Sequence, residues 1–268
     1  ARVQHLGGIQ LATALSRNEV SVETVEHLLA ALVSMSIDNV LIELNSPEVP
    51  IMDGSSAPFI FLIQEAGVKV QAAARQYLKI LRPISLARGD KHIALYPSDE
   101  FRVTYSISYD HPLLRHQQRT ITITEESFIE EIAPARTFTF LKDVEMLRRN
   151  GLALGGSLDN AIVLGETGVL NNALRFEDEF VRHKILDVIG DMALVGYPII
   201  GHLVAHRARI VDHQNLAHGF FLVLNLNQNN SSSPPDSTSS RTSATKSSGA
   251  WVHTHTVAAT RTASLIVT

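Results

Sequence analysis

The sequence predicts an α+β fold organised in two similar layers. Two observations carry this prediction: runs of strands are followed by pairs of helices, and this order occurs twice along the chain. A third is the composition, with 45% hydrophobic and 19% charged residues, which is ordinary for a globular protein. A chain of 268 residues is long enough to bury a sizeable core and to form two domains.

The first part of the chain alternates between strand and helix patterns. A strand is expected around residues 8–15, and a helix over 21–35, where apolar residues recur with helical spacing. The β-branched run at 37–44 predicts a strand, and the prolines that follow it mark a loop. A second helix is predicted over 57–66, because Gly67 supplies a stop signal.

The second part begins with strands and ends with helices. Alternating and β-branched residues predict strands at 77–81, 92–96, 101–108 and 119–124. Two helices, a short strand and a final helix are expected after them, at 125–132, 139–150, 160–163 and 176–196. The final helix has the strongest helical pattern in the chain.

Three regions follow from these patterns. Residues 1–73 are expected to form a first α+β domain, and residues 74–208 a second α+β domain that contains the helix at 176–196. Residues 209–268 are expected to be a largely disordered tail. The polar tract at 225–248, rich in Ser, Thr and Asn, cannot bury enough apolar surface to offset the entropy of ordering.

Composition excludes several classes of function. A net charge of -4 gives no basic surface, so nucleic acid is not an expected partner. The absence of cysteine excludes disulfides, thiolate zinc sites and cysteine nucleophiles. The chain has no run of eighteen apolar residues, so we expect no transmembrane segment. It begins at Ala1 without a signal peptide, and we interpret it as a processed piece of a soluble, cytoplasmic protein.

The helix at 176–196 carries three polar side chains at four-residue steps. His183, Asp187 and Asp191 therefore lie one above another on a single helix face. A stripe of this kind is costly to bury without a partner, and a divalent cation would supply one. The competing interpretation is a solvated helix surface, because Arg182 and Lys184 lie on the same helix.

A metal site needs a further ligand from elsewhere in the chain. A catalytic zinc commonly has three protein ligands and an open position for water. His27 is one candidate, because the adjacent Glu26 could act as a base. Spacing alone does not distinguish His27 from His92, His202 or His206.

Five blocks of the sequence have a recognisable pattern: Thr24–Leu32, Pro47–Phe59, Ala135–Phe138, Gly155–Ile162 and Leu174–Asp191. These blocks resemble the LpxC family of bacterial UDP-3-O-acyl-N-acetylglucosamine deacetylases. The similarity is near-continuous from Ala1 to about Arg207.

The resemblance implies a zinc-dependent amide hydrolase of lipid A biosynthesis. The implied fold is two β-α-α-β layers sandwiched together, with the site at their junction. His27, His183 and Asp187 match the family's zinc ligands, and Glu26 matches its general base. The implied substrate is UDP-3-O-((R)-3-hydroxyacyl)-N-acetylglucosamine, from which the enzyme removes the N-acetyl group.

Three further residues match positions with a role in the family. Thr137 matches a threonine whose hydroxyl stabilises the developing oxyanion. Lys184 matches a lysine near the charged portion of the substrate, and Asp191 a carboxylate that orients a catalytic histidine.

The resemblance also implies a passage for the acyl chain and a cellular setting. We expect an insert within residues 148–172 to form this passage, with Leu152, Leu154 and Leu158 as its walls or as ordinary core residues. The enzyme is expected to be a cytoplasmic monomer that contacts the inner membrane surface transiently.

Two departures from the family lead to an alternative interpretation. The chain begins part-way through the family's first domain, so we expect an incomplete first layer with an open sheet edge. The match to the family is expected to end near Ala208, before the segment that carries the family's catalytic histidine. His206, His213 and His218 are equal candidates to replace it. The alternative is therefore a truncated, non-catalytic homologue that binds zinc or the nucleotide-sugar lipid without turnover.

Overall fold

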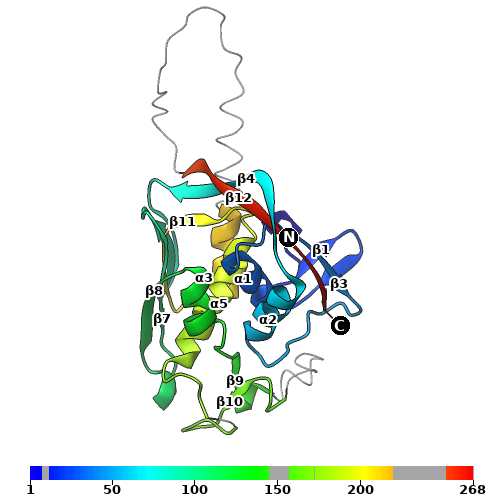
Figure 1. Ribbon diagram of the computed structural model, residues 1–268. Helices are drawn as coiled ribbons and strands as arrows, with labels where there is room; N and C mark the ends of the chain where they lie inside the picture. Colours follow the sequence, from blue (N-terminus) through cyan, green and yellow to red (C-terminus); the bar gives the residue numbers. More distant parts are fainter. Residues whose placement is uncertain (8–11, 145–156, 172, 220–251, 268) are drawn as a thin grey trace, which may run out of the picture.

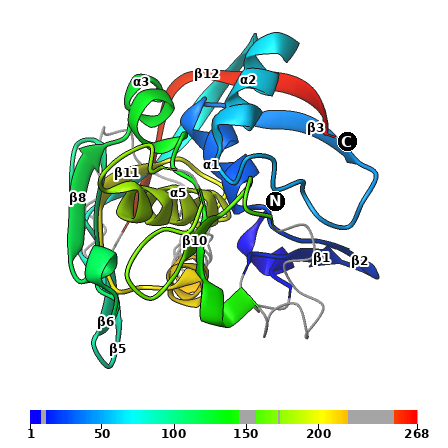
Figure 2. The ribbon, with the colours of Figure 1, turned by 90° about the horizontal axis from the view of Figure 1, so that it is seen from below.

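A large curved sheet encloses two helices at the centre of the molecule (Figures 1 and 2). The computed structural model describes residues 1–7, 12–144, 157–171, 173–219 and 252–267. Helices α1 (Glu26–Ser34) and α5 (Glu179–Ala193) pack against each other between the two halves of this sheet. The arrangement confirms the predicted α+β class.

The remaining elements surround these two helices. The strands are β1 (Leu15–Arg17), β2 (Val20–Val22), β3 (Asn39–Leu44), β4 (Lys69–Ile80), β5 (Ile84–Arg88), β6 (Lys91–Tyr96), β7 (Phe101–Ile107), β8 (Gln117–Thr122), β9 (Phe138–Phe140), β10 (Ile162–Leu164), β11 (Ile199–His206) and β12 (Val252–Val267). The other helical segments are η1 (Val3–His5), α2 (Ala57–Ala66), η2 (Pro112–Leu114), α3 (Glu125–Ser127) and the π-helical turn η3 (Phe128–Ile132). A further helix covers residues 210–219.

The eight-stranded sheet joins both parts of the chain. Its order is β3-β12-β4-β11-β6-β5, and β7 extends it by pairing with β11 and β8. Strand β11 alternates strictly between buried and half-buried residues, as a strand with one face on the core should. Strand β4 runs without interruption across residues 72–76, where the sequence placed a domain boundary.

Helix α5 lies in the middle of the core. Of its fifteen residues, all but Lys184 and Ala193 are buried, so no face of this helix is left to solvent. A helix buried on all sides is expected to be apolar all round, yet this one carries buried charged residues. These buried charged residues make α5 the candidate location of a functional site.

Most predicted elements are present, with differences at their ends. The helix expected over 21–35 begins at Glu26, because residues 20–22 instead pair with β1. Thr24, between the strand and the helix, has a left-handed backbone with φ of 57°. The helix expected at 139–150 is preceded by β9, which pairs in parallel with β10. Residues 141–144 are helical, and residues 145–156 lie outside the described residues.

The C-terminal region differs from the predicted disordered tail. Residues 210–219 are helical, and β12 lies between β3 and β4, parallel to the first and antiparallel to the second. Strand β12 therefore joins β3 to the rest of the sheet, in which β3 is the terminal strand of the order (Figure 1). Composition could not reveal this, because the pairing partners of β12 lie far away in the sequence. The polar tract at 225–248 lies outside the described residues.

Arg261 of β12 forms hydrogen bonds with three residues outside the strand. The Arg261 backbone N–H donates to Asp38 Oδ2, and its guanidinium donates to the Met35 carbonyl and to Glu125 Oε2. Asp38 Oδ1 in turn accepts from Arg75 Nε of β4 at 2.7 Å. The Asp38 carboxylate thus adds a side-chain link between β12 and β4, next to the end of α1, to the backbone pairing of these strands.

Candidate active site

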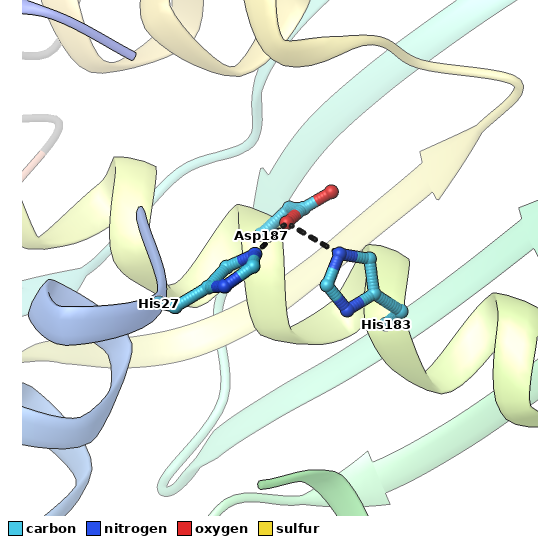
Figure 3. A group of neighbouring side chains, drawn as sticks. All are labelled: His27, His183 and Asp187. Atoms are coloured by element: carbon cyan, nitrogen blue, oxygen red, sulfur yellow. Dashed lines mark ion pairs between the residues drawn. The ribbon is translucent and has the colours of Figure 1, made fainter. Parts of the chain in front are cut away.

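Three buried side chains from α1 and α5 converge at the centre of the molecule (Figure 3). His27 comes from the first turn of α1, and His183 and Asp187 lie one turn apart on α5. Asp187 Oδ1 is 3.3 Å from His183 Nε2 and 3.8 Å from His27 Nε2. All three ligand atoms lie within 4.8 Å of one another.

This arrangement fits a tetrahedral metal ion. Two ligand atoms that each lie about 2.1 Å from a tetrahedral zinc are separated by about 3.4 Å. The His183–Asp187 distance of 3.3 Å matches this value, and the His27–Asp187 distance of 3.8 Å is somewhat longer. Metal ligands must be unprotonated, and burial lowers the pKa of His27 to about 3 and also lowers the pKa of His183. Burial raises the pKa of Asp187, but the charge of Lys184, the electrostatic interaction with the two histidines and the hydrogen bond from Lys184 outweigh this effect and hold the carboxyl ionised.

A backbone carbonyl fixes the orientation of the His183 ring on the side away from the other two ligands. Its Nδ1 lies 3.0 Å from the carbonyl oxygen of Ala135, which can only accept a hydrogen bond. Nδ1 therefore carries the hydrogen, and the lone pair of Nε2 points towards Asp187 and His27. A backbone carbonyl in this position is the usual way in which a protein selects the tautomer of a metal-binding histidine.

Glu26 lies next to His27 with one oxygen free. Its Oε1 accepts from the backbone N–H of Thr13, while the buried Oε2 has no hydrogen-bond partner among the described residues. Burial and the nearby charges of Asp191 and Asp187 raise the pKa of Glu26 well above its ordinary value. A carboxylate with a raised pKa and a free buried oxygen is suited to take up a proton.

Two further predicted site residues, Lys184 and Thr137, differ in how they relate to the three ligands. Lys184 Nζ donates to Asp187 Oδ2 at 2.8 Å, so the two oxygens of this carboxylate face different partners. The same ammonium lies 5.4 Å from the centre of the Phe138 ring. Thr137 is half-buried between Arg136 and Phe138, and its backbone N–H donates to the Gly54 carbonyl at 2.8 Å.

Asp191 holds one histidine of the C-terminal helix. His213 Nδ1 lies 2.9 Å from Asp191 Oδ2, and His213 Nε2 lies 2.8 Å from the Tyr105 hydroxyl. That hydroxyl donates its only hydrogen to the carbonyl of Ala208, so Nε2 must donate to Tyr105. His213 therefore carries a hydrogen on Nε2.

The other histidines considered from the sequence lie elsewhere. His202 is bonded to Thr104, and His206 to Ser106, both across the pairing of β11 with β7. His218 is exposed, and His92 is half-buried on β6. Among the described residues, the group that could hold a metal contains His27 and none of these four.

Sequence reasoning missed the residues that connect these groups. Thr13 is fully buried and bridges two carboxylates, since its N–H donates to Glu26 and its hydroxyl to Asp191. Gln214 Nε2 donates to the same hydroxyl oxygen at 2.8 Å. Gly190 allows α1 to approach α5, because a Cβ at this position would lie 2.1 Å from the Glu26 carbonyl oxygen. A glycine inside a buried helix was the one available signal.

The expected acyl-chain passage remains a prediction. Leu152 and Leu154 lie outside the described residues, and Leu158 is 56% exposed. A cavity of about 250 Å³ lies at the opposite ends of α1 and α5, where Val33, Met192 and Ile199 contribute to its wall. Cavity volume therefore does not identify the site, and the converging polar side chains do.

No helix among the described residues combines the length and the apolar character that crossing a membrane requires.

Comparison with known proteins shows what this chain is similar to. Residues 1–221 match the family described as LpxC: UDP-3-O-acyl N-acetylglycosamine deacetylase. A protein of Syntrophotalea carbinolica is 53% identical over 207 residues, which are 76% of this chain and 67% of the relative. A protein of Methylococcus capsulatus is 49% identical over 211 residues, or 78% and 69% of the two chains. Both are named UDP-3-O-acyl-N-acetylglucosamine deacetylase.

The family match corrects one expectation from the sequence. The similarity was expected to end near Ala208, but the matched region extends to residue 221 and includes the helix at 210–219. His213 therefore lies inside the region that matches the family.

Proposed function

The chain belongs to the LpxC family of UDP-3-O-acyl-N-acetylglucosamine deacetylases, and from this premise we propose that it is a zinc-dependent enzyme of that specificity. It removes the N-acetyl group from UDP-3-O-((R)-3-hydroxyacyl)-N-acetylglucosamine and releases acetate. The observation that carries the proposal is the buried group of His27, His183 and Asp187 beside the free oxygen of Glu26.

His27, His183 and Asp187 would hold the zinc ion. When bound, zinc polarises the acetamide carbonyl and lowers the pKa of water, which is the chemistry that amide hydrolysis needs. The donor set supports this assignment, because two neutral imidazoles and one carboxylate are common ligands of catalytic zinc.

Glu26 takes the proton from the attacking water at Oε2. Its Oε1 is held by the Thr13 amide, so the carboxylate has a fixed orientation and one oxygen left for this task. The raised pKa matches the function of a base that must accept a proton near neutral pH. Thr137, the residue before β9, is the proposed donor to the developing oxyanion, and its backbone N–H is bonded to the Gly54 carbonyl.

His213 returns a proton to the leaving amine in this proposal. Asp191 accepts a hydrogen bond from His213 Nδ1 and stabilises the imidazolium. To transfer its proton, Nε2 must break its hydrogen bond to Tyr105 and form one to the leaving nitrogen. Lys184 places a positive charge beside Asp187, and we assign it to the charged portion of the substrate. All these groups come from one chain, which supports the proposal of a monomer. As a further part of the proposal, the enzyme acts in the cytoplasm and meets its acylated substrate at the inner membrane surface.

Acetate release from the acylated UDP-sugar tests the proposal. The zinc-loaded chain should release one acetate for each substrate consumed, and Glu26→Gln should reduce the rate by about 10²- to 10⁴-fold. The matched control is His202→Ala, which removes a half-buried histidine outside the site and should keep its activity. If the native chain binds zinc and substrate but releases no acetate, the proposed function is wrong.

A further inference from the structure

A buried ion pair joins the segment before β9 to the first residue of α5. Glu179 is fully buried, and its two oxygens accept from Arg136 Nε at 2.9 Å and from an Arg136 terminal nitrogen at 3.1 Å. The backbone N–H of Arg136 donates to the same carboxylate at 3.0 Å, and that of Arg175 at 2.7 Å. The pair therefore fixes the Arg136 backbone as well as its side chain.

The position of this pair relates it to the metal ligands. Glu179 lies one turn before His183 on α5, on the same helix face. Arg136 lies next to Ala135, whose carbonyl accepts from His183 Nδ1. The carbonyl that selects the tautomer of His183 is thus held against α5 by the ion pair one turn away.

The same pair also fixes the position of Thr137 relative to α5. Thr137 follows Arg136 directly, and its own backbone bonds go to Gly54 and Ile162 rather than to α5. Among the described residues, the direct polar links between the 135–137 segment and α5 are the Arg136–Glu179 pair and the Ala135–His183 bond. Without the pair, the segment that carries Thr137 would be less firmly fixed to α5. The position of the Thr137 hydroxyl relative to the His183 imidazole would then vary.

We propose that Arg136 and Glu179 are positioning residues that set the geometry of His183 and Thr137 for the reaction. Stability alone gives no reason to keep such a pair, because replacing a buried ion pair by apolar residues is often neutral or stabilising. A bidentate guanidinium–carboxylate contact adds directional constraint, which is what a ligand-orienting carbonyl needs. This inference rests on the proposed function for Thr137, and on the metal site alone for His183.

Zinc affinity provides a test that does not depend on turnover. We would measure the zinc dissociation constant of the full chain by competition with a chromophoric chelator, for the native protein, Glu179→Gln and Arg136→Lys. Both variants should bind zinc about 10- to 100-fold more weakly, the usual effect of losing a group that orients a metal ligand. Asp178→Asn is the matched control: it lies beside Glu179 but pairs with Arg119 and Arg182, and its affinity should not change.

The activity of the same variants tests the part that concerns Thr137. Glu179→Gln at saturating zinc should lower kcat by tenfold or more, with KM changed less than about threefold, because the oxyanion donor acts in the transition state. Combining Glu179→Gln with Arg136→Lys should cost no more than the larger single effect, since both remove one interaction.

Two outcomes would overturn the inference. One is a folded Glu179→Gln chain, judged by circular dichroism, that binds zinc as tightly as the native chain. The other is an equal loss of affinity in Asp178→Asn. If Glu179→Gln does not fold, the zinc affinity of the milder variant Arg136→Lys provides the same test. Failure of the native chain to release acetate would refute the proposed function, while the comparison of zinc affinities would still test the ion pair.

Discussion

His213 Nδ1 lies 2.9 Å from Asp191 Oδ2, and neither side chain has any exposed surface. Thr13 continues this contact to Glu26, because its hydroxyl donates to Asp191 and its backbone N–H to Glu26. The proposed base and the proposed acid therefore lie at the two ends of one chain of hydrogen bonds. Such a chain can hold both groups in orientation without exposing either to bulk water.

Replacing His213 should slow the reaction without removing the substrate or the metal. His213 is the proposed donor of the proton that the leaving amine needs, so His213→Gln should lower kcat by about 10²- to 10⁴-fold and leave zinc affinity unchanged. His206→Gln is the control, since His206 is bonded to Ser106 across the pairing of β11 with β7, away from Asp191. A native kcat in His213→Gln would exclude His213 as the acid.

Gly190→Ala should disturb the site through the backbone of α1. The added Cβ would lie 2.1 Å from the Glu26 carbonyl oxygen and 2.8 Å from its carbonyl carbon, so α1 must move away from α5. We expect a loss of about 1–3 kcal/mol in the free energy of unfolding and weaker zinc binding, because His27 moves with Glu26. Urea unfolding and chelator competition measure these effects. Gly168→Ala, where nothing lies within 4 Å of the added Cβ, should change neither.

The stability of the metal-free chain should depend on pH through His27. Burial lowers its folded pKa from 6.5 to about 3, so between these values the unfolded chain binds a proton that the folded chain does not. The free energy of unfolding should therefore fall as pH decreases from 6.5 towards 3, by at most about 1.4 kcal/mol per pH unit from this residue. His27→Gln should flatten the curve, as measured by urea unfolding between pH 4 and 7.

Glu26 has the opposite effect on the pH dependence of the free energy of unfolding. Its pKa is raised on folding, so above its ordinary value of 4.5 the folded chain binds more protons and stability falls as pH rises. Glu26→Gln should consequently make the dependence due to His27 steeper. Parallel curves for the native chain and both variants would show that these side chains are not buried as described.

The attachment of β12 should depend more on Asp38 than on Arg261. Asp38→Asn weakens the bond to Arg75, a largely buried pair, and also the contact with the Arg261 backbone. We expect it to lower the free energy of unfolding by about 3 kcal/mol, as for a buried ion pair that loses one charge. Arg261→Met should cost about 1 kcal/mol or less, because that guanidinium is 37% exposed. Asp99→Asn, in an exposed pair with Lys79, serves as the control, and an equal effect of all three in urea unfolding would contradict this ranking.

The sequence predicted most elements because their signals are local. The helix at 57–66 ends before Gly67, whose φ of 74° suits a glycine, and both the pattern and the stop signal lie within a few residues. The shared helix face of His183 and Asp187 follows from their four-residue spacing alone. The resemblance to the LpxC family added His27, which spacing did not distinguish from three other histidines.

Only the tertiary structure decided how distant segments meet. It placed His213, and neither His206 nor His218, against Asp191, placed Thr13 between Glu26 and Asp191, and inserted β12 between β3 and β4. The physical reason is that helix periodicity fixes which side chains share a face, but not which face another helix or strand will contact. That choice depends on close approaches such as the one at Gly190, and on the need to pair every charge that the core encloses.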